Sequence, residues 1–136
     1  MTATIILEGR WKLSKQNSYL ARPHGGKYKN PKYVAEQQRL IMAMRPQLIA
    51  QGWKCTKNRV ALNITFYGPT MPIDWDNCGV LTDAMQGKSV VLGHKRYRID
   101  GLVVVDDKQF VPVTVNWHKD RTRKIIIDLK EMAEAK

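Results

Sequence analysis

Cysteines are scarce in this sequence, and long apolar runs are absent. Cys55 and Cys78 are the only two cysteines and form no CxxC pair, so a disulfide scaffold is not indicated and a reducing compartment is expected. No apolar stretch approaches the roughly 20 residues needed to span a bilayer. Met1–Arg10 also lacks the apolar core of a signal peptide. We therefore expect a cytoplasmic protein with no membrane partner.

Several common catalytic arrangements are also missing. The three histidines, His24, His94 and His118, are not spaced with cysteines as zinc ligands are. The sequence has no glycine-rich phosphate loop, and no Ser or Cys nucleophile is paired with a histidine. These absences argue against a zinc protein, a P-loop nucleotide hydrolase and a nucleophile–histidine hydrolase.

Acidic residues are few, and their distribution is uneven. The 136 residues include 23 Lys plus Arg against 12 Asp plus Glu, a net charge of +11 that favours a polyanionic partner such as nucleic acid. Residues 1–70 hold twelve basic and two acidic side chains, whereas residues 71–136 hold eleven and ten. Acids repel phosphate, so a chain built only to coat nucleic acid has little use for those in the second half.

The hydropathy pattern predicts a single α+β domain over residues 1–136, with a mixed, largely antiparallel sheet packed against two main helices. The predicted strands are Thr4–Leu7, Val60–Phe66, Leu102–Val105, Val111–Trp117 and Lys124–Leu129. Pro112 indicates that its strand lies at an edge or begins late, and Lys119–Arg123 is expected to form a basic hairpin turn. Residues 130–136 are compatible with a helix that frays at the end of the chain.

Asn30-Pro31 is typical of a helix start, and Gly52 of a helix end. Pro46 should kink or divide this helix. Its apolar face is expected to comprise Val34, Leu40, Ile41, Met44 and Leu48. A short second helix is expected at Cys78–Met85, a long basic surface loop at residues 8–30 and a basic ribbon at Gly87–Asp100.

Asp74 and Asp76 are separated by one residue, so an extended backbone would direct both carboxylates to one side. Two such carboxylates can share a hard divalent cation. Asp106 and Asp107 end a predicted strand, where a third carboxylate could reach the same ion. The alternative is that each Asp pair is a turn or a helix cap, with Asp76-Asn77 capping the helix that follows.

Basic residues gather in three segments with aromatic residues between them, a pattern that favours contact with nucleic-acid phosphates over base reading. The three segments are residues 27–33, 94–98 and 119–124. The alternative for each is a solvated surface. The predicted DNA-binding residues are Lys12, Lys15, Arg22, Lys27, Lys29, Lys95, Arg96, Arg98, Lys119, Arg121 and Arg123.

Three motifs together resemble the RusA family of Holliday junction resolvases: DWDN at Asp74–Asn77, TDAM at Thr82–Met85 and VVDDKQ at Val104–Gln109. The segment after the first predicted strand is similar as well, through Ser14, Asn17, Tyr19 and Arg22. The resemblance implies a homodimeric, Mg²⁺-dependent endonuclease of bacterial or phage origin that cuts four-way DNA junctions symmetrically, with Mn²⁺ able to substitute. Its catalytic, metal-binding aspartates would be Asp74, Asp76 and Asp107.

Two features depart from the family: the basic ribbon Gly87–Asp100 is an insertion between the short helix and Asp107, and a catalytic Lys is missing. Members carry a catalytic Lys about one helical turn after the second aspartate, but here Val80 lies at that position, and no basic residue occurs between Asn77 and Gly87. Lys88 is the candidate replacement as a catalytic charge stabiliser, and a residue of the basic segments is another. The alternatives are a junction- or nucleic-acid-binding protein without catalysis, and a basic RNA-binding structural protein.

Overall fold

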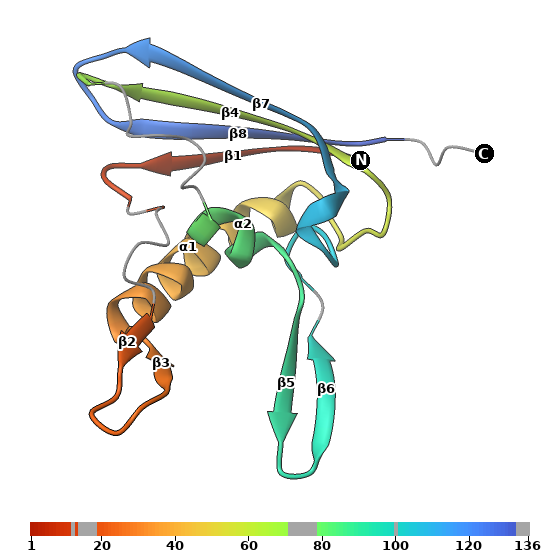
Figure 1. Cartoon of the computed structure of the whole chain (residues 1–136). Coiled ribbons are helices and arrows are strands. Elements are labelled where there is room, and N and C mark those ends of the chain that lie inside the picture. The colour runs from red at the N-terminus through yellow and green to blue at the C-terminus, as the bar shows by residue number, and fades with distance from the viewer. Residues whose placement is uncertain (12, 14–18, 71–78, 100, 133–136) are drawn as a thin grey trace.

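The fold is seen in a computed structural model that describes residues 1–11, 13, 19–70, 79–99 and 101–132. A four-stranded sheet lies above two helices, and two hairpins project below them (Figure 1). The sheet comprises β1 (Thr2–Glu8), β4 (Val60–Gly68), β7 (Phe110–Lys119) and β8 (Lys124–Glu131). In the order β1-β8-β4-β7, only the β4–β7 pair is parallel. The α+β class and the largely antiparallel sheet are therefore confirmed.

Strict alternation along the strands determines which face of the sheet packs on the helices. Val60, Leu62, Ile64 and Phe66 of β4 are buried, as predicted, and the residues between them are half-buried. β8 alternates in the same way and lies beside β4. β7 is an edge strand, as Pro112 indicated. The core is thus the layer between this face and the helices.

The helices are α1 (Pro31–Ala50) and α2 (Gly79–Met85). The Asn30 side chain accepts a hydrogen bond from the Lys32 N–H at 3.0 Å, and Gly52 follows the helix with a φ of 73°, so both predicted ends of α1 are confirmed. Within the described residues, neither helix combines the length and the apolar character needed to cross a membrane.

Pro46 does not divide α1, which is continuous through it, and one residue of the expected apolar face is exposed. A proline removes the hydrogen bond to the carbonyl four residues earlier, here that of Met42, a residue that is 74% exposed. Val34 is 37% exposed, because the buried line of α1 runs through Gln37, Leu40, Met44 and Leu48, and the start of the helix lies farthest from the sheet (Figure 1).

The predicted strand Leu102–Val105 does not form. Val103 and Val104 are fully buried, but both donate backbone hydrogen bonds to the Met85 carbonyl at the end of α2, at 3.0 and 3.2 Å. Val104 makes isolated bridges with Thr56 and Gln86. The apolar side chains of this segment reflect its burial. Its backbone is bonded to the end of a helix and to a loop, so it is not a strand of the sheet.

The predicted hairpin at Lys119–Arg123 was also wrong. β7 and β8 are separated by β4, so the basic loop between them crosses the end of β4, where the Asp120 N–H bonds the Gly68 carbonyl at 2.9 Å. β8 continues to Glu131, which places residues 130 and 131 in a strand, where helix had been expected. Residues 133–136 lie outside the described part of the chain.

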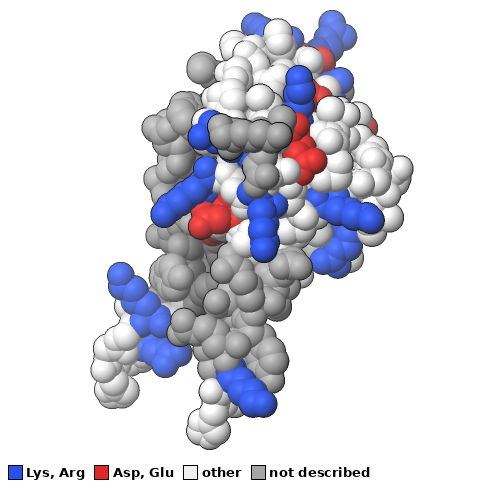
Figure 2. Space-filling view, turned by 90° about the vertical axis from the view of Figure 1, so that its right-hand side faces the viewer, with Lys and Arg blue, Asp and Glu red and all other residues white. Residues whose placement is uncertain are grey.

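Two hairpins extend from the body of the protein. The expected loop at residues 8–30 contains β2 (Tyr19–Ala21) paired with β3 (Lys27–Lys29). The expected ribbon is confirmed as β5 (Lys88–Leu92) paired with β6 (Lys95–Ile99). Both hairpins project from the same side of the molecule, away from the sheet (Figure 1), and they are separate prongs when the view is turned (Figure 2).

The edge strand β1 is covered by glutamine side chains from α1. Gln47 accepts from the Ile6 N–H and donates to the Ile6 carbonyl, both at 2.8 Å. Gln51, one turn later, makes the same pair of bonds with Thr4 at 2.8 and 2.7 Å. Two amides at i and i+4 thus replace a neighbouring strand and hold α1 against the sheet.

Replacing Gln47 by Ala should lower the free energy of unfolding by about 1–3 kcal/mol, because two hydrogen bonds to β1 are lost at about 0.5–1.5 kcal/mol each. The matched control is Gln38→Ala, at an exposed position on the same helix, which should change stability by less than about 0.5 kcal/mol. Urea unfolding measures both. Equal midpoints for the two variants would contradict this role of Gln47.

Candidate metal centre and nucleic-acid interface

Asp107 begins a short 3-10 turn, η2 (Asp107–Gln109), at the exposed surface between α2 and β7. Asp106 is the N-cap of this turn: its carboxylate accepts from the Lys108 N–H at 3.0 Å, and its own N–H donates to the Gln109 side chain at 2.9 Å. This reciprocal capping box gives Asp106 a structural role and separates it in function from its neighbour.

Gln109 ties the Asp107 turn to the loop before β4. Its Oε1 accepts from the Val105 and Asp106 N–H groups at 3.0 and 2.9 Å. Its Nε2 donates to the carbonyls of Thr56 and Asn58, both at 2.8 Å. The amide therefore uses both donor protons and both acceptor lone pairs on backbone groups of two segments about 50 residues apart in sequence.

A second network ties the turn to the helices. The Gln86 Oε1 accepts from the Asp107 N–H at 3.1 Å, and the Gln86 Nε2 donates to Asp83 at 2.9 Å. The other oxygen of Asp83 accepts from the Tyr33 hydroxyl of α1. This chain of contacts makes the position of Asp107 depend on both helices. It also accounts for Asp83 of the TDAM motif, which holds the turn through Gln86.

The base of the β5–β6 ribbon lies directly beside the Asp107 turn. The Gly87 N–H bonds the carbonyls of Val104 and Val105 at 3.1 and 3.2 Å, so the chain entering the ribbon is joined to the chain that has left it. Gly101 lies in this crossing. A Cβ there would come within 2.0 Å of the Val104 carbonyl oxygen and 2.6 Å of the Gly87 nitrogen, a close approach of backbone that glycine permits.

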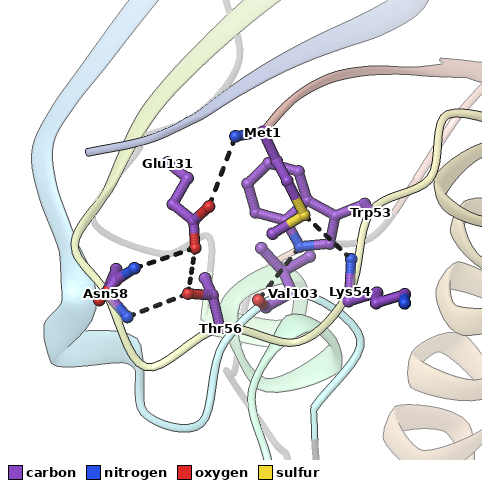
Figure 3. Close-up of polar contacts among 7 residues, drawn as sticks. All are labelled: Met1, Trp53, Lys54, Thr56, Asn58, Val103 and Glu131. Atoms are coloured by element: carbon purple, nitrogen blue, oxygen red, sulfur yellow. Dashed lines mark hydrogen bonds and ion pairs between the residues drawn. The ribbon is translucent and has the colours of Figure 1, made fainter. Parts of the chain in front are cut away.

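The loop that receives Gln109 is held by a further polar cluster (Figure 3). Glu131 accepts from the Thr56 hydroxyl, from Asn58 Nδ2 at 3.2 Å and from the N-terminal ammonium at 3.4 Å. These donors, Thr56 foremost, lower the pKa of Glu131 below its ordinary value. Trp53 Nε1 donates to the Val103 carbonyl at 3.2 Å. The end of β8 thus braces the loop beneath the candidate site.

The predicted metal ligands are only partly described. Asp74 and Asp76 lie outside the described residues, Asp107 is exposed on its turn, and Lys88 is the first residue of β5, with its side chain outside the description. No group of three or more His, Cys, Asp or Glu capable of holding a metal occurs among the residues that the structure does describe. That the three aspartates lie close enough to share one ion therefore stays a prediction. Their carboxylate oxygens are the donors that Mg²⁺ prefers.

Val80, the residue in place of the family's Lys, is 1% exposed in the core. Its backbone N–H also bonds the Leu13 carbonyl at 3.0 Å. This position of α2 therefore serves packing.

The predicted DNA-binding residues fall in separate places. Arg22, Lys27 and Lys29 belong to the β2–β3 hairpin and its turn, and Lys95, Arg96 and Arg98 to β6. Both of these sets lie on the projecting hairpins, where Figure 2 shows Lys and Arg side chains. Lys119, Arg121 and Arg123 lie at the far end of the sheet, at and after the end of β7. Lys12 and Lys15 are outside the described residues.

Sequence reasoning missed the residues that position the site. Gln109 belongs to the VVDDKQ motif, yet only the Asp residues of that motif were given a role. Gln86 and Gly101 carried no signal, because their contacts join segments distant in sequence and follow no periodicity.

No family model matches this chain, and no curated protein matches it significantly. The resemblance to resolvases therefore depends on the motifs and the N-terminal segment named above.

Changing Gly101 to Ala should destabilise the protein by about 1–3 kcal/mol, since the added methyl would overpack the backbone at the base of the ribbon. Gly68→Ala is the matched control, because its Cβ would make contacts of ordinary length, 3.5 Å to the Arg123 side chain and 3.8 Å to the Thr70 carbonyl oxygen. Thermal and urea unfolding compare the two. A Gly101→Ala protein as stable as Gly68→Ala would show that the crossing is not this tight.

Proposed function

We propose that this protein is a metal-dependent, structure-selective endonuclease that resolves four-way DNA junctions by paired, symmetric incision. The observation that supports this most directly is the exposed Asp107 turn, which is held by Asp83 through Gln86 and by Gln109. Asp83 and Gln109 both belong to the motifs that resemble the RusA family. Asp83 and Gln109 are not proposed metal ligands, but they hold the turn that carries Asp107, which explains why they occur in the same motifs as the aspartates.

In this proposal Asp74, Asp76 and Asp107 hold Mg²⁺, with Mn²⁺ able to replace it. The chemistry supplied by the bound ion is stabilisation of charge on the phosphate and activation of water. Asp106 keeps the turn in place as its N-cap. Lys88, at the start of β5, is proposed to supply the positive charge for which the family uses a Lys in the helix.

The two hairpins are proposed to hold the DNA backbone. Neither residues 19–29 nor residues 88–99 contain an acidic residue, and both hairpins project from one side of the molecule (Figure 1). Isolated two-stranded hairpins add little stability, so this single-sign charge is better explained by contact with phosphate than by folding. Lys12 and Lys15 precede the first hairpin in the chain and would extend this contact.

A four-way junction is two-fold symmetric, so paired incision requires two matched active sites. We therefore propose that the protein acts as a homodimer. Its substrate would place it in the cytoplasm, on the nucleoid or on phage DNA.

The second candidate function is a junction- or nucleic-acid-binding protein without catalysis. The observation that favours it is Val80, which is buried in α2 at the position of the family's Lys. This alternative predicts tight binding of the junction and no incision with any divalent ion.

Asp107→Asn and Asp106→Asn form a matched pair, because each removes one negative charge and Asn caps a helix as well as Asp. With a synthetic four-way junction and Mg²⁺, Asp107→Asn should reduce the rate of paired nicking at least about 100-fold, since even the outer partners of metal ligands are worth about 10- to 100-fold. Asp106→Asn should stay within about threefold of the wild type, as its cap is kept.

Junction affinity in EDTA serves as the control and should be equal for the two variants or slightly above the wild type. Junction binding with no nicks by the wild-type protein in Mg²⁺ or Mn²⁺ would refute the enzymatic proposal and leave the binding function. Equal loss of nicking in both variants would contradict the separate roles of the two aspartates.

A further inference from the structure

Three side chains form a stacked row on the face of the sheet opposite the helices. Tyr67 of β4 is paired in register with His118 of β7 on one side and with Lys124 of β8 on the other. The Tyr67 and His118 rings are stacked, with centroids 5.3 Å apart and planes at 27°. Lys124 Nζ lies 4.7 Å from the centroid of the Tyr67 ring. The order along the row is therefore cation, phenol and imidazole.

The two ends of this row differ. Beyond Lys124 lies Glu8 of β1, its partner in register, so the paired strand β1 occupies this end of the row. At the other end His118 is exposed on β7, and no strand in the described part of the chain pairs with the outer edge of β7. The stack thus ends in an imidazole ring at an open sheet edge, where one more flat ring could continue it.

A basic loop with defined backbone contacts adjoins this end of the row. Lys119 and Arg121 are exposed, and Arg123 follows two residues later. The Arg123 carbonyl accepts from the Gly9 N–H at 2.9 Å, which ties the loop to the end of β1. Within the loop, the Asp120 carboxylate accepts hydrogen bonds from the Thr122 N–H at 3.2 Å and from the Thr122 hydroxyl at 3.4 Å. These bonds lower the pKa of Asp120. The only acid of the loop is thereby occupied in shaping it.

We infer that this surface binds single-stranded nucleic acid, with one unpaired base stacked on His118 and the adjoining phosphates held by Arg121 of the basic loop. A base within a duplex is already stacked on both faces, so only an unpaired base could extend the row. The surface lies at the opposite end of β7 from the Asp107 turn, roughly 30 Å away along a ten-residue strand. It is a second site, and it needs no metal.

The test compares two fluorescent probes of equal length and charge, an oligothymidylate and an oligomer of abasic spacers, by anisotropy in EDTA at fixed salt. The wild type should bind the thymine probe roughly 5- to 100-fold more tightly, the range that base stacking gives. His118→Ala should abolish this preference, and His118→Phe should keep it. Arg121→Ala should weaken both probes by the same factor, because it contacts phosphate only.

Thr114→Ala is the matched control, an exposed position on the same face of β7, and should leave both affinities unchanged. Equal wild-type affinity for the two probes would overturn the proposal and indicate contact with phosphate alone. So would a His118→Ala variant that loses affinity for both probes equally. Because EDTA removes divalent ions, the result does not depend on whether the protein cuts junctions.

Discussion

The side-chain amide of Gln109 is the contact on which the candidate site depends. It accepts from two backbone N–H groups in front of the Asp107 turn and donates to two carbonyls of the loop before β4. That loop is itself held by Glu131 at the end of β8 and lies beside the buried Val103. Gln109 thus connects the turn that carries Asp107 to the central sheet.

Glutamine serves the same purpose elsewhere in the fold. Gln47 and Gln51 take the place of a strand beside β1, and Gln86 connects Asp107 to α2. A neutral amide supplies a donor and an acceptor at once, as a peptide group does, and it does not titrate. Scaffold contacts made in this way need no additional carboxylate, in a chain with only 12 acids.

Much of the fold follows from local signals in the sequence. The Asn30-Pro31 start of α1 and the alternation of β4 are predicted correctly, because capping and burial of alternate residues are short-range effects. Leu102–Val105 was taken for a strand because a buried loop and a buried strand have the same composition. The crossing of β4 by the loop after β7 was missed because strand order is a long-range property.

The candidate site could be predicted only in part. The motifs identify Asp107, and the pattern alone does not distinguish it from Asp106, which caps the turn through bonds to residues two and three positions on. Gly101 is required by backbone that approaches it from Gln86, Gly87 and Val104, a contact that exists only once the ribbon has closed. Side-chain to backbone contacts over such separations carry no periodic signal.

The charge of +11 is divided between distinct surfaces: two acid-free hairpins on one side, and a basic loop beside a stacked row at the far end of the sheet. The central claim is that an acidic centre containing Asp107 lies within this basic chain. Calorimetric titration with Mn²⁺ tests it most directly. The account predicts binding by the wild type that is lost in Asp74→Asn, Asp76→Asn and Asp107→Asn and kept in Asp106→Asn. An Asp107→Asn protein that binds Mn²⁺ as the wild type does, or a wild type that binds none, would contradict it.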